Sequence, residues 1–312
     1  MAQAMQHRLV RVNGLQLSTW LVGDGPRLAL LLHGFPDDPG SLVPLAERLA
    51  GRGFRCALPH LRGQGRSERP ADRDYSLPAL ARDAVGLIDA LEGERALLVG
   101  HDWGALIGYA AANLSPGLVS HLVALALPPP EAFLRAVRAH PRQLRRSWYM
   151  GLFQLPGLAE RALRRRNYAL IDRLWREWSP GWEPPPERLS EVKRTFDWPG
   201  TVDAALALYR NLVPRPGRLG AWREGLRLAL PPLRVPTLVV AGQEDGCIGV
   251  ETFQGLERCF AARHRLEVLL EHGHWLPLEA PDRLAELIDE HLAADEPPPS
   301  TRRGRRPLPV VA

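Results

Sequence analysis

An aspartate flanked by glycines is the residue of this sequence with the clearest chemical use. Segment 100–104 reads GHDWG, directly after an apolar run and directly before a helical pattern. Glycines on both sides of a nucleophile let the backbone turn sharply between a strand and a helix, so the central side chain, here Asp102, projects from the strand's end. Taken alone, Asp102 could equally be the N-cap of that helix, a common position for aspartate.

Three further motifs, in a fixed order along the chain, favour a nucleophile over a helix cap. Segment 33–36 (HGFP) ends a predicted strand, where hydrolases of this layout place an oxyanion loop. Asp245 follows a second predicted strand, and His274, in the sequence GHW, follows a third. Nucleophile, acid and histidine stand in the chain order of the α/β-hydrolase triad, which predicts Asp102, Asp245 and His274 as catalytic residues.

Neighbouring residues offer alternatives for two members of this set. His272 lies two positions before His274, but the Gly-His-Trp context favours His274. Glu244 precedes Asp245, and alternation along the loop turns only one of the two towards the histidine; Asp245 fits that position better. The oxyanion hole would use two backbone N–H groups, those of Phe35 and Trp103. Three serines lie away from the predicted elbow and are not rival nucleophiles: Ser41, Ser67 and Ser76.

A carboxylate nucleophile points to substrates with a leaving group on saturated carbon. Its attack there gives a stable alkyl ester, which a water activated by histidine can hydrolyse. Epoxides and alkyl halides are the two obvious classes. A halide leaves as a stable anion, whereas an epoxide oxygen leaves as a basic alkoxide and needs an acid, for which tyrosine is suitable. Three tyrosines follow in a helical stretch: Tyr149, Tyr168 and Tyr209.

Alternating strands and helices must position these groups. The patterns predict strands at 7–13, 16–22, 27–33, 55–61, 95–100, 121–127, 237–241 and 265–270, and helices at 41–50, 76–91, 103–114, 250–262 and 281–292. Such alternation predicts a mostly parallel, doubly wound sheet. We expect the core to comprise residues 1–130 and 221–294, with a helical cap at 131–220 and a disordered tail at 295–312, rich in Pro and Arg.

Composition restricts the possible partners. No segment of the 312 residues has the roughly 20 continuous apolar positions that span a bilayer, and residues 1–11 lack a signal-peptide pattern, so we expect a cytoplasmic protein with no membrane partner. The three cysteines form no disulfide or metal-binding pattern. The net charge of +5 comes with no nucleic-acid-binding motif, which favours a solvated arginine-rich surface. We expect a monomer or homodimer with neither a metal nor a cofactor.

The chain resembles the soluble epoxide hydrolases of the α/β-hydrolase fold over nearly its whole length. The resemblance rests on HGFP at 33–36, LRGQGRS at 61–67, GHDWG at 100–104, WYMGLFQLPG at 148–157, LYRN at 208–211 and GHW at 273–275. It implies an α/β-hydrolase fold with a helical cap, hydrolysis of an epoxide to a diol, and no cofactor. In that family two cap tyrosines hold and protonate the epoxide oxygen, and the matching positions are Tyr149 and Tyr209.

The substrate pocket is expected between these motifs and the cap, and we assign to it His33, Pro36, Trp148, Leu152 and Phe153. The chain departs from common family patterns at His60, where members often have aspartate, and at 207–208, where they have Asn-Tyr or Asn-Trp. Neither departure touches a predicted catalytic group.

Two other functions remain open. A haloalkane or haloacid dehalogenase shares the aspartate elbow, and Trp103 is compatible with halide binding. Dehalogenases, however, often have Asn, Gln or Glu where Phe35 stands, and they need no tyrosine pair. A ligand-binding protein on the same scaffold is the other alternative. Such proteins often lose a member of the triad, whereas all three residues are present here.

Overall fold

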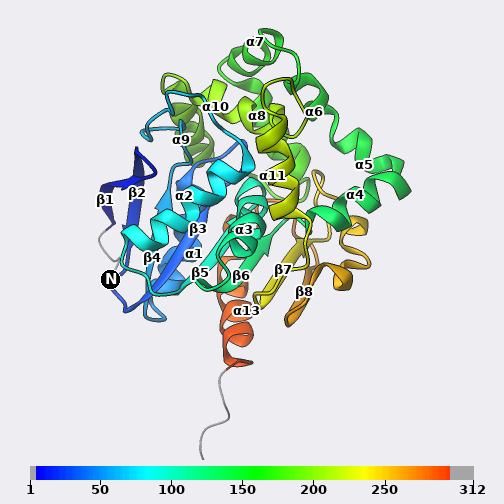
Figure 1. The fold of residues 1–312 in the computed structure, drawn as a ribbon. Helices are drawn as coiled ribbons and strands as arrows, with labels where there is room; N and C mark the ends of the chain where they lie inside the picture. The colour runs from blue at the N-terminus through cyan, green and yellow to red at the C-terminus, as the bar shows by residue number, and fades with distance from the viewer. Residues whose placement is uncertain (1–4, 296–312) are drawn as a thin grey trace, which may run out of the picture.

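The computed structural model describes residues 5–295 and shows an eight-stranded sheet (Figure 1). The strand order is β1-β2-β4-β3-β5-β6-β7-β8; β1 and β2 pair antiparallel, as do β2 and β4, and all other pairs are parallel. The strands are β1 (Gln6–Val12), β2 (Leu15–Val22), β3 (Arg27–Leu32), β4 (Phe54–Pro59), β5 (Ala96–His101), β6 (Val119–Leu125), β7 (Thr237–Gly242) and β8 (His264–Leu269). This is the predicted α/β-hydrolase fold.

Helices cover both faces of the sheet because its central strands are apolar on both sides. Every residue of β5 is buried. Leu98 packs into the same apolar cluster as α2 (Leu77–Ala90) and α3 (Trp103–Leu114), whereas Leu97 and Val99 pack with α1 (Val43–Ala50) and α13 (Pro281–Ala293). The sheet is thus the middle layer of three.

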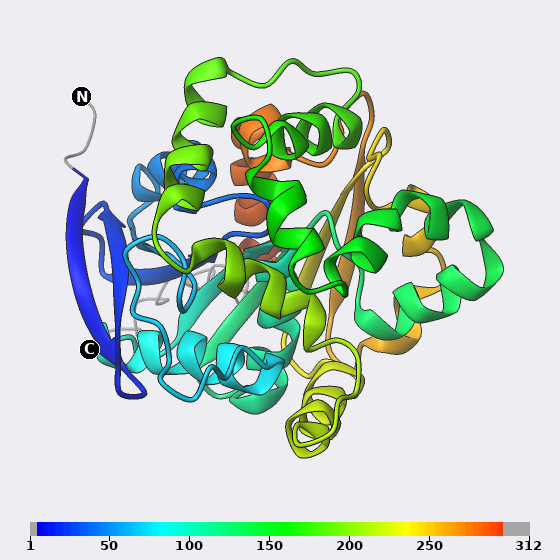
Figure 2. The same ribbon diagram turned by 90° about the horizontal axis from the view of Figure 1, so that it is seen from above.

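The chain between β6 and β7 lies wholly within the described residues, and the elements in it are all helices. They are α4 (Pro130–Ala139), α5 (Pro141–Arg146), α6 (Trp148–Phe153), α7 (Leu158–Arg164), α8 (Ala169–Trp178), α9 (Pro186–Asp197), α10 (Thr201–Arg210) and α11 (Leu219–Ala229). We refer to α4–α10 as the cap. Seen from above, the cap spreads over the sheet, and α4 and α5 project to one side (Figure 2). Helix α11 instead packs against α2 and α3.

One predicted helix is wrong. Residues 250–262 form two short 3₁₀ turns, Val250–Phe253 and Leu256–Cys259, instead of one helix. Gln254 is extended (ψ 140°) and Gly255 is left-handed (φ 63°), so the helical hydrogen-bond ladder cannot continue between the turns. The predicted tail lies outside the described residues, except for Asp295. No described helix is both long and apolar enough to cross a membrane.

Candidate active site

The predicted nucleophile sits in a strained turn between β5 and α3. Asp102 has φ 53° and ψ −115°, a conformation that a residue with a side chain adopts only when its surroundings impose it. The chain passes close to itself here: a Cβ at Gly100 would lie 2.2 Å from the carbonyl oxygen of Gly104, and a Cβ at Gly104 would lie 2.0 Å from that of Leu32. Both glycines of the motif are therefore required by close approach of the backbone.

The Asp102 carboxylate faces the loop that follows β3. The backbone N–H of Phe35 donates to its Oδ1 at 2.9 Å, and a Cβ at Gly34 would lie 2.5 Å from that oxygen. Burial raises the pKa of the Asp102 carboxyl above its ordinary value; the His274 ring and the N–H groups of Phe35 and Trp103 offset this only in part. The two N–H groups predicted for the oxyanion hole thus both act on Asp102.

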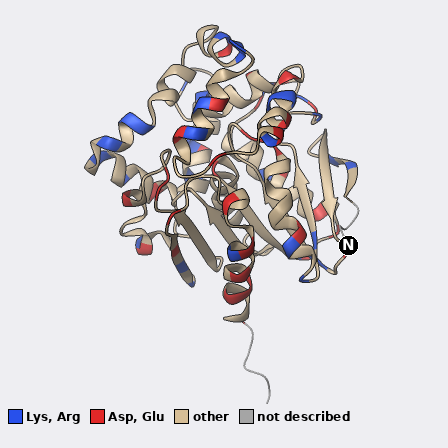
Figure 3. Cartoon of the chain, turned by 180° about the vertical axis from the view of Figure 1, so that it is seen from behind, with Lys and Arg blue, Asp and Glu red and all other residues tan. Residues whose placement is uncertain are grey.

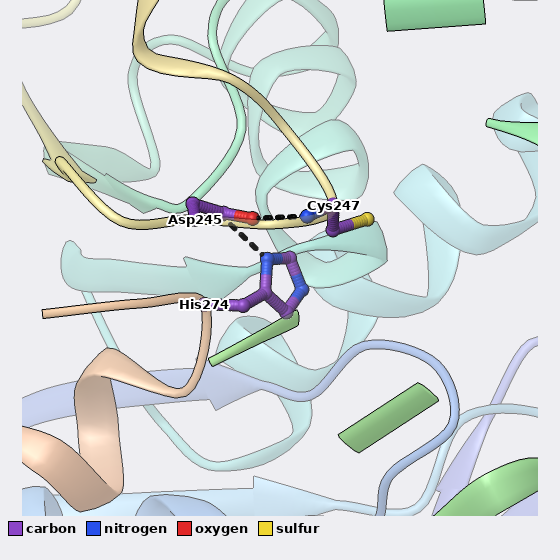
Figure 4. Close-up of side chains that lie close together, drawn as sticks. All are labelled: Asp245, Cys247 and His274. Atoms are coloured by element: carbon purple, nitrogen blue, oxygen red, sulfur yellow. Dashed lines mark hydrogen bonds and ion pairs between the residues drawn. The ribbon is translucent and has the colours of Figure 1, made fainter. Parts of the chain in front are cut away.

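His274 and Asp245 form a buried pair beside the nucleophile. The Nδ1 of His274 lies 2.8 Å from Oδ2 of Asp245 (Figure 4). The other oxygen of Asp245 accepts hydrogen bonds from the backbone N–H groups of Cys247 and Ile248 at 2.6 and 2.8 Å. Asp245 thus accepts three hydrogen bonds. Because one of them comes from Nδ1 of His274, Asp245 fixes the histidine tautomer that carries hydrogen on Nδ1. Glu244, by contrast, is exposed.

The second ring nitrogen of His274 points at the nucleophile. Its Nε2 lies 3.8 Å from Oδ2 of Asp102, is buried, and has no hydrogen-bond partner within residues 5–295. Burial alone would lower the pKa of His274, but the carboxylates of Asp245 and Asp102 outweigh burial and raise it. The geometry leaves a basic nitrogen beside Asp102, able to take a proton from water. His272 turns elsewhere, with its ring 2.6 Å from the carbonyl oxygen of Leu270.

Asp245, Cys247 and His274 could also be considered as metal ligands, because one donor atom of each lies within 4.8 Å of the others (Figure 4). However, the Asp245 oxygens and His274 Nδ1 already bond to protein groups. Burial, together with the Asp245 and Asp102 charges, holds the pKa of Cys247 well above its ordinary value, so its sulfur is a thiol and not the thiolate that binds metals. The donor set fits a hydrogen-bonded triad better than a metal site.

The cap brings Tyr149 and Tyr209 to the same place. Their rings meet edge to face, 5.7 Å between centroids, and Tyr209 also packs against Phe35 at 5.2 Å and Trp103 at 5.1 Å. The Tyr209 hydroxyl is buried and has no hydrogen-bond partner among the described residues, whereas that of Tyr149 lies 3.3 Å from the sulfur of Cys247. Burial raises the pKa of both tyrosines well above 10, and the Asp102 charge adds to this, so both hydroxyls keep their protons.

The third tyrosine is placed differently. The Tyr168 hydroxyl donates to the carbonyl oxygen of Phe196 at 3.1 Å and to the Asp197 carboxylate at 2.9 Å. It therefore ties α8 to α9 inside the cap and does not reach Asp102.

A cavity of about 410 Å³, here named the Asp102 cavity, connects the nucleophile and the two tyrosines. Asp102, Tyr149 and Tyr209 are among its few polar residues, and most of its wall is apolar: Trp103, Leu106, Phe133, Leu134, Met150, Leu212, Val213, Trp222, Leu226, Leu230 and Ile248. An apolar cavity with a few convergent polar groups is the usual form of a small-molecule site.

None of the five residues predicted for the substrate pocket lines the Asp102 cavity, which corrects that expectation. Trp148 is 38% exposed and lies under the Arg173 guanidinium. Phe153 is fully buried against Phe35 and Tyr209, and Leu152 packs onto the same apolar cluster. The other two predicted residues, His33 and Pro36, lie in the core. They belong to the loop after β3, which we call the oxyanion loop.

Both of these loop residues act through hydrogen bonds. The His33 ring is fully buried; its Nδ1 lies 3.0 Å from the carbonyl oxygen of Gly34, and its Nε2 accepts from the N–H of Leu61 at 3.2 Å. The Pro36 carbonyl accepts a hydrogen bond from the Trp175 indole at 2.8 Å. They hold the loop that carries Phe35, one layer away from the cavity.

Sequence reasoning also missed residues that support the site. His101 Nε2 lies 2.8 Å from the backbone oxygen of His274, and Gln143 of the cap bonds both the carbonyl of Cys247 (2.8 Å) and the N–H of Gly249 (3.0 Å). The position of His101, inside the elbow motif, was a usable signal. Nothing in the sequence around Gln143 marks it, because these two backbone partners lie more than a hundred residues away.

Comparisons with known proteins identify the family. Residues 29–281 match the family described as alpha/beta hydrolase fold. The chain is 30% identical over 294 residues to the AB hydrolase superfamily protein YfhM of Bacillus subtilis, covering 91% of this chain and 97% of that protein. It is also 30% identical over 299 residues to epoxide hydrolase 3 of Xenopus tropicalis, covering 93% and 78%.

A solved structure gives the same result in three dimensions. The crystal structure of the Bacillus megaterium epoxide hydrolase in complex with an inhibitor superposes with a TM-score of 0.80 at 25% identity, covering 92% of this chain and all of that one. Fold, site geometry and these relatives lead to one conclusion: the chain belongs to the alpha/beta hydrolase fold family and, within it, to the soluble epoxide hydrolases.

Proposed function

We propose that this protein hydrolyses an epoxide to a vicinal diol through an ester between substrate and Asp102. The observation that carries the proposal is the convergence, on one apolar cavity, of a carboxylate at an elbow with two protonated tyrosine hydroxyls. A carboxylate that attacks saturated carbon needs an acid opposite it only when the leaving oxygen is strongly basic.

In the first step, Asp102 attacks one carbon of the epoxide ring and the bond from that carbon to the ring oxygen breaks. The oxygen takes a proton from Tyr149 or Tyr209. The tyrosine becomes a tyrosinate, and Asp102 loses its negative charge when it forms the ester. The charge of Asp102 raises the pKa of the tyrosine, so the loss of that charge makes the tyrosine more acidic during the step in which it gives up its proton. Negative charge thus moves from one side of the cavity to the other.

In the second step, Nε2 of His274 takes a proton from a water molecule whose oxygen attacks the carbonyl carbon of the ester. Asp245 stabilises the imidazolium across the 2.8 Å contact, and the N–H groups of Phe35 and Trp103 stabilise the oxyanion. The diol oxygen leaves with the proton held by His274. The second proton of the water remains on the carboxyl group of Asp102. It passes from there to the tyrosinate, which restores both side chains to their starting states.

A halide leaving group fits the site less well. Position 35 holds a phenylalanine whose ring packs against Tyr209 and Phe153, so its side chain offers no donor beside Trp103. The tyrosine hydroxyls, moreover, would have no role in the departure of a stable anion. Screening epoxides and haloalkanes for diol and halide release separates the two activities.

Trapping the ester tests the mechanism. His274→Gln should still open the ring but should not hydrolyse the ester, so intact mass spectrometry should show one substrate added per chain on the peptide that contains Asp102. His272→Gln is the matched control and should turn over normally, and Asp102→Ala should give no adduct. Absence of an adduct in His274→Gln, under conditions where the wild type turns over, would contradict the scheme.

The fate of oxygen tests the nucleophile directly. With excess enzyme in heavy-oxygen water, a single turnover should give mostly unlabelled diol and a labelled Asp102 peptide, because water attacks the carbonyl carbon of the ester. Fully labelled diol with unlabelled Asp102 would mean direct attack of water on the epoxide, and the ester would have to be abandoned.

A further inference from the structure

Helix α5 of the cap buries a polar side chain and exposes an apolar one. Gln143 is the only buried residue among its six, whereas the next residue, Leu144, is 59% exposed. Arg142 and Arg145 are also exposed, and basic side chains mark the outer surface of this part of the cap (Figure 3). Burying an amide costs free energy unless hydrogen bonds replace those it made with water, so stability alone would favour burial of the leucine. A local pattern that is reversed in this way is typical of a residue with a functional role.

We propose that Gln143 is a positioning residue for the hydrolysis of the ester. It holds residues 245–249, here named the acid loop, in the conformation that keeps the Asp245 carboxylate against His274. Gln143 does not line the Asp102 cavity, so it acts on the reaction only through other residues. This inference rests on the proposed function and assigns a residue of the cap to its second step.

The link between Gln143 and Asp245 passes through a single peptide group. Nε2 of Gln143 donates to the carbonyl oxygen of Cys247 at 2.8 Å, and the N–H of Ile248, in the same peptide group, donates to Oδ1 of Asp245 at 2.8 Å. A trans peptide group is planar and its C=O and N–H point in opposite directions, so a bond that fixes one also fixes the other. In a buried chain of this kind the hydrogen bonds also polarise one another. Gln143 therefore orients one of the two loop N–H groups that donate to Asp245.

Further polar groups of the acid loop are also held from the cap. Oε1 of Gln143 accepts a hydrogen bond from the N–H of Gly249 at 3.0 Å, and the N–H of Gly246 donates to the carbonyl oxygen of Trp178 on α8 at 3.0 Å. Nε2 of Gln143 also donates to the Ser147 hydroxyl at 3.2 Å, so both hydrogens and the oxygen of the amide are engaged. The conformation of the acid loop is thus set from the cap, although the loop itself follows strand β7.

Hydrolysis of the ester depends on this loop more than ring opening does. Oδ2 of Asp245 bonds Nδ1 of His274 at 2.8 Å, and only the second step uses His274 as a base. A carboxylate that loses a donor on Oδ1 is free to rotate, which takes Oδ2 away from the histidine. Ring opening instead uses Asp102 and Tyr149, and aromatic packing holds the Tyr149 ring. Loss of the Gln143 hydrogen bonds should therefore separate the two steps.

Single turnovers measure ring opening and ester hydrolysis separately. Gln143→Met nearly keeps the size of the side chain and removes its hydrogen bonds. It should slow hydrolysis by about 10²-fold, between the loss of one neutral hydrogen bond and the loss of a triad acid, and ring opening by no more than about threefold. Arg146→Met is the matched control on the same helix. It breaks the 3.1 Å ion pair between Arg146 and Glu251 but leaves the Gln143 bonds in place, so both steps should stay within about twofold of the wild type.

A double-mutant cycle shows whether Gln143 acts through Asp245. In an Asp245→Asn background, Gln143→Met should slow hydrolysis no further, because the carboxylate that the acid loop orients is already gone. Equal slowing in both backgrounds, or equal slowing of both steps, would mean that Gln143 only stabilises the cap and would overturn the assignment. If Gln143→Met does not fold, Gln143→Asn takes its place. Its amide is one carbon shorter and cannot reach both backbone groups, so a smaller loss confined to hydrolysis is expected.

The proton between His274 and Asp245 reports the same geometry without any substrate. A hydrogen held between a buried imidazole and a carboxylate gives a proton NMR signal far downfield, and the signal moves upfield as that bond weakens. The signal should be the same in the wild type and Arg146→Met, and it should move upfield in both Asp245→Asn and Gln143→Met. An unchanged signal in Gln143→Met would overturn the role of Gln143. If the wild type forms no ester with any epoxide, the proposed function fails, and this signal still decides whether Gln143 positions Asp245.

Discussion

The two halves of the candidate active site are held in different ways. On the core side, each group is fixed by hydrogen bonds: Asp245 accepts three, and the backbone of His274 is bonded on both sides, its N–H to Ser179 (2.8 Å) and its oxygen to His101 (2.8 Å). On the cap side, aromatic packing holds the Tyr209 ring, and the Tyr209 hydroxyl has no hydrogen-bond partner within 3.5 Å among the described residues.

This difference fits the roles that we propose for the two sets of residues. The triad residues need defined charges and tautomers, which only directed hydrogen bonds specify. The tyrosines need hydroxyls that can turn towards a ligand oxygen, so ring packing must fix the side chain while leaving the polar atom available. A site of this kind needs both a polar and an aromatic support.

The two supports also meet. The Arg188 guanidinium on α9 forms a buried ion pair with Asp38, in the loop that follows the oxyanion loop, and Thr195 donates to the same carboxylate at 2.6 Å. The cap backbone at Trp178 accepts hydrogen bonds from the N–H groups of Gly246 (3.0 Å) and His274 (3.2 Å). The cap therefore positions part of the triad, in addition to supplying the tyrosines.

Removing the acid of the triad should have the largest effect on the polar half. Asp245→Asn should slow hydrolysis of the ester by about 10⁴-fold, the loss typical of a triad acid, and the ester should accumulate. His274 must be neutral to act as a base, so ester hydrolysis should rise with pH through the pKa of His274, which burial lowers and the Asp245 carboxylate raises. Burial alone lowers that pKa, so in Asp245→Asn the midpoint should move to lower pH.

The pH–rate profile of ester hydrolysis, followed in single turnovers of wild type and Asp245→Asn, measures this shift. Ring opening, by contrast, needs protonated tyrosines, and their pKa values are raised well above the ordinary value in the free enzyme, so ring opening should not slow on the alkaline side up to about pH 9.5. A midpoint that stays in place in Asp245→Asn would show that Asp245 does not set the basicity of His274.

The sequence was most informative where one residue type admits few roles. The glycines around Asp102, the chain order of the motifs and the buried apolar strands together predicted the fold and the residues that gather at the carboxyl edge of the sheet. These signals are local, because each depends on a strand and the turn that follows it.

The sequence was least informative where packing decides. Trp148 and Phe153 lie in the motif that carries Tyr149, yet one faces solvent and the other the aromatic cluster, while part of the cavity wall comes from Trp222 and Leu226 on α11. An amphipathic pattern shows that a helix has an apolar face, but it does not show whether that face meets a core or a cavity. The wrong helix at 250–262 has a different origin: the break lies in the local backbone conformations of Gln254 and Gly255, and a glycine inside a helical pattern does not by itself end a helix.

Removing the tyrosine hydroxyls should have the largest effect on the aromatic half. Tyr209→Phe and Tyr149→Phe should each slow ring opening by about 10²-fold and the double variant by more, because the alkoxide then leaves without an acid. The rings, and thus the packing, stay in place. Single-turnover ester formation in a His274→Gln background isolates this step from hydrolysis. Rapid ester formation in the double variant would assign the proton to another group.

The smallest effect should come from substitution of Cys247, which contacts Asp245 on the core side and Tyr149 on the cap side. Its backbone N–H donates to Asp245 (2.6 Å), whereas its thiol lies 3.3 Å from the Tyr149 hydroxyl. Any substitution other than proline keeps the first bond, but only a side chain that can hydrogen bond keeps the second. Cys247→Val should therefore slow ring opening by about threefold to tenfold, the equivalent of one neutral hydrogen bond, and Cys247→Ser should restore it.

A double-mutant cycle shows whether Cys247 acts through Tyr149. In a Tyr149→Phe background, Cys247→Val should have no further effect on ring opening, since the hydroxyl that the thiol holds is already gone. The acid midpoint of the pH–rate profile should be the same in Cys247→Val as in the wild type, because the bond from the Cys247 backbone to Asp245 persists. Equal losses in both backgrounds, or a shifted midpoint, would mean that Cys247 belongs to the support of the triad and that Tyr149 is positioned by its ring alone.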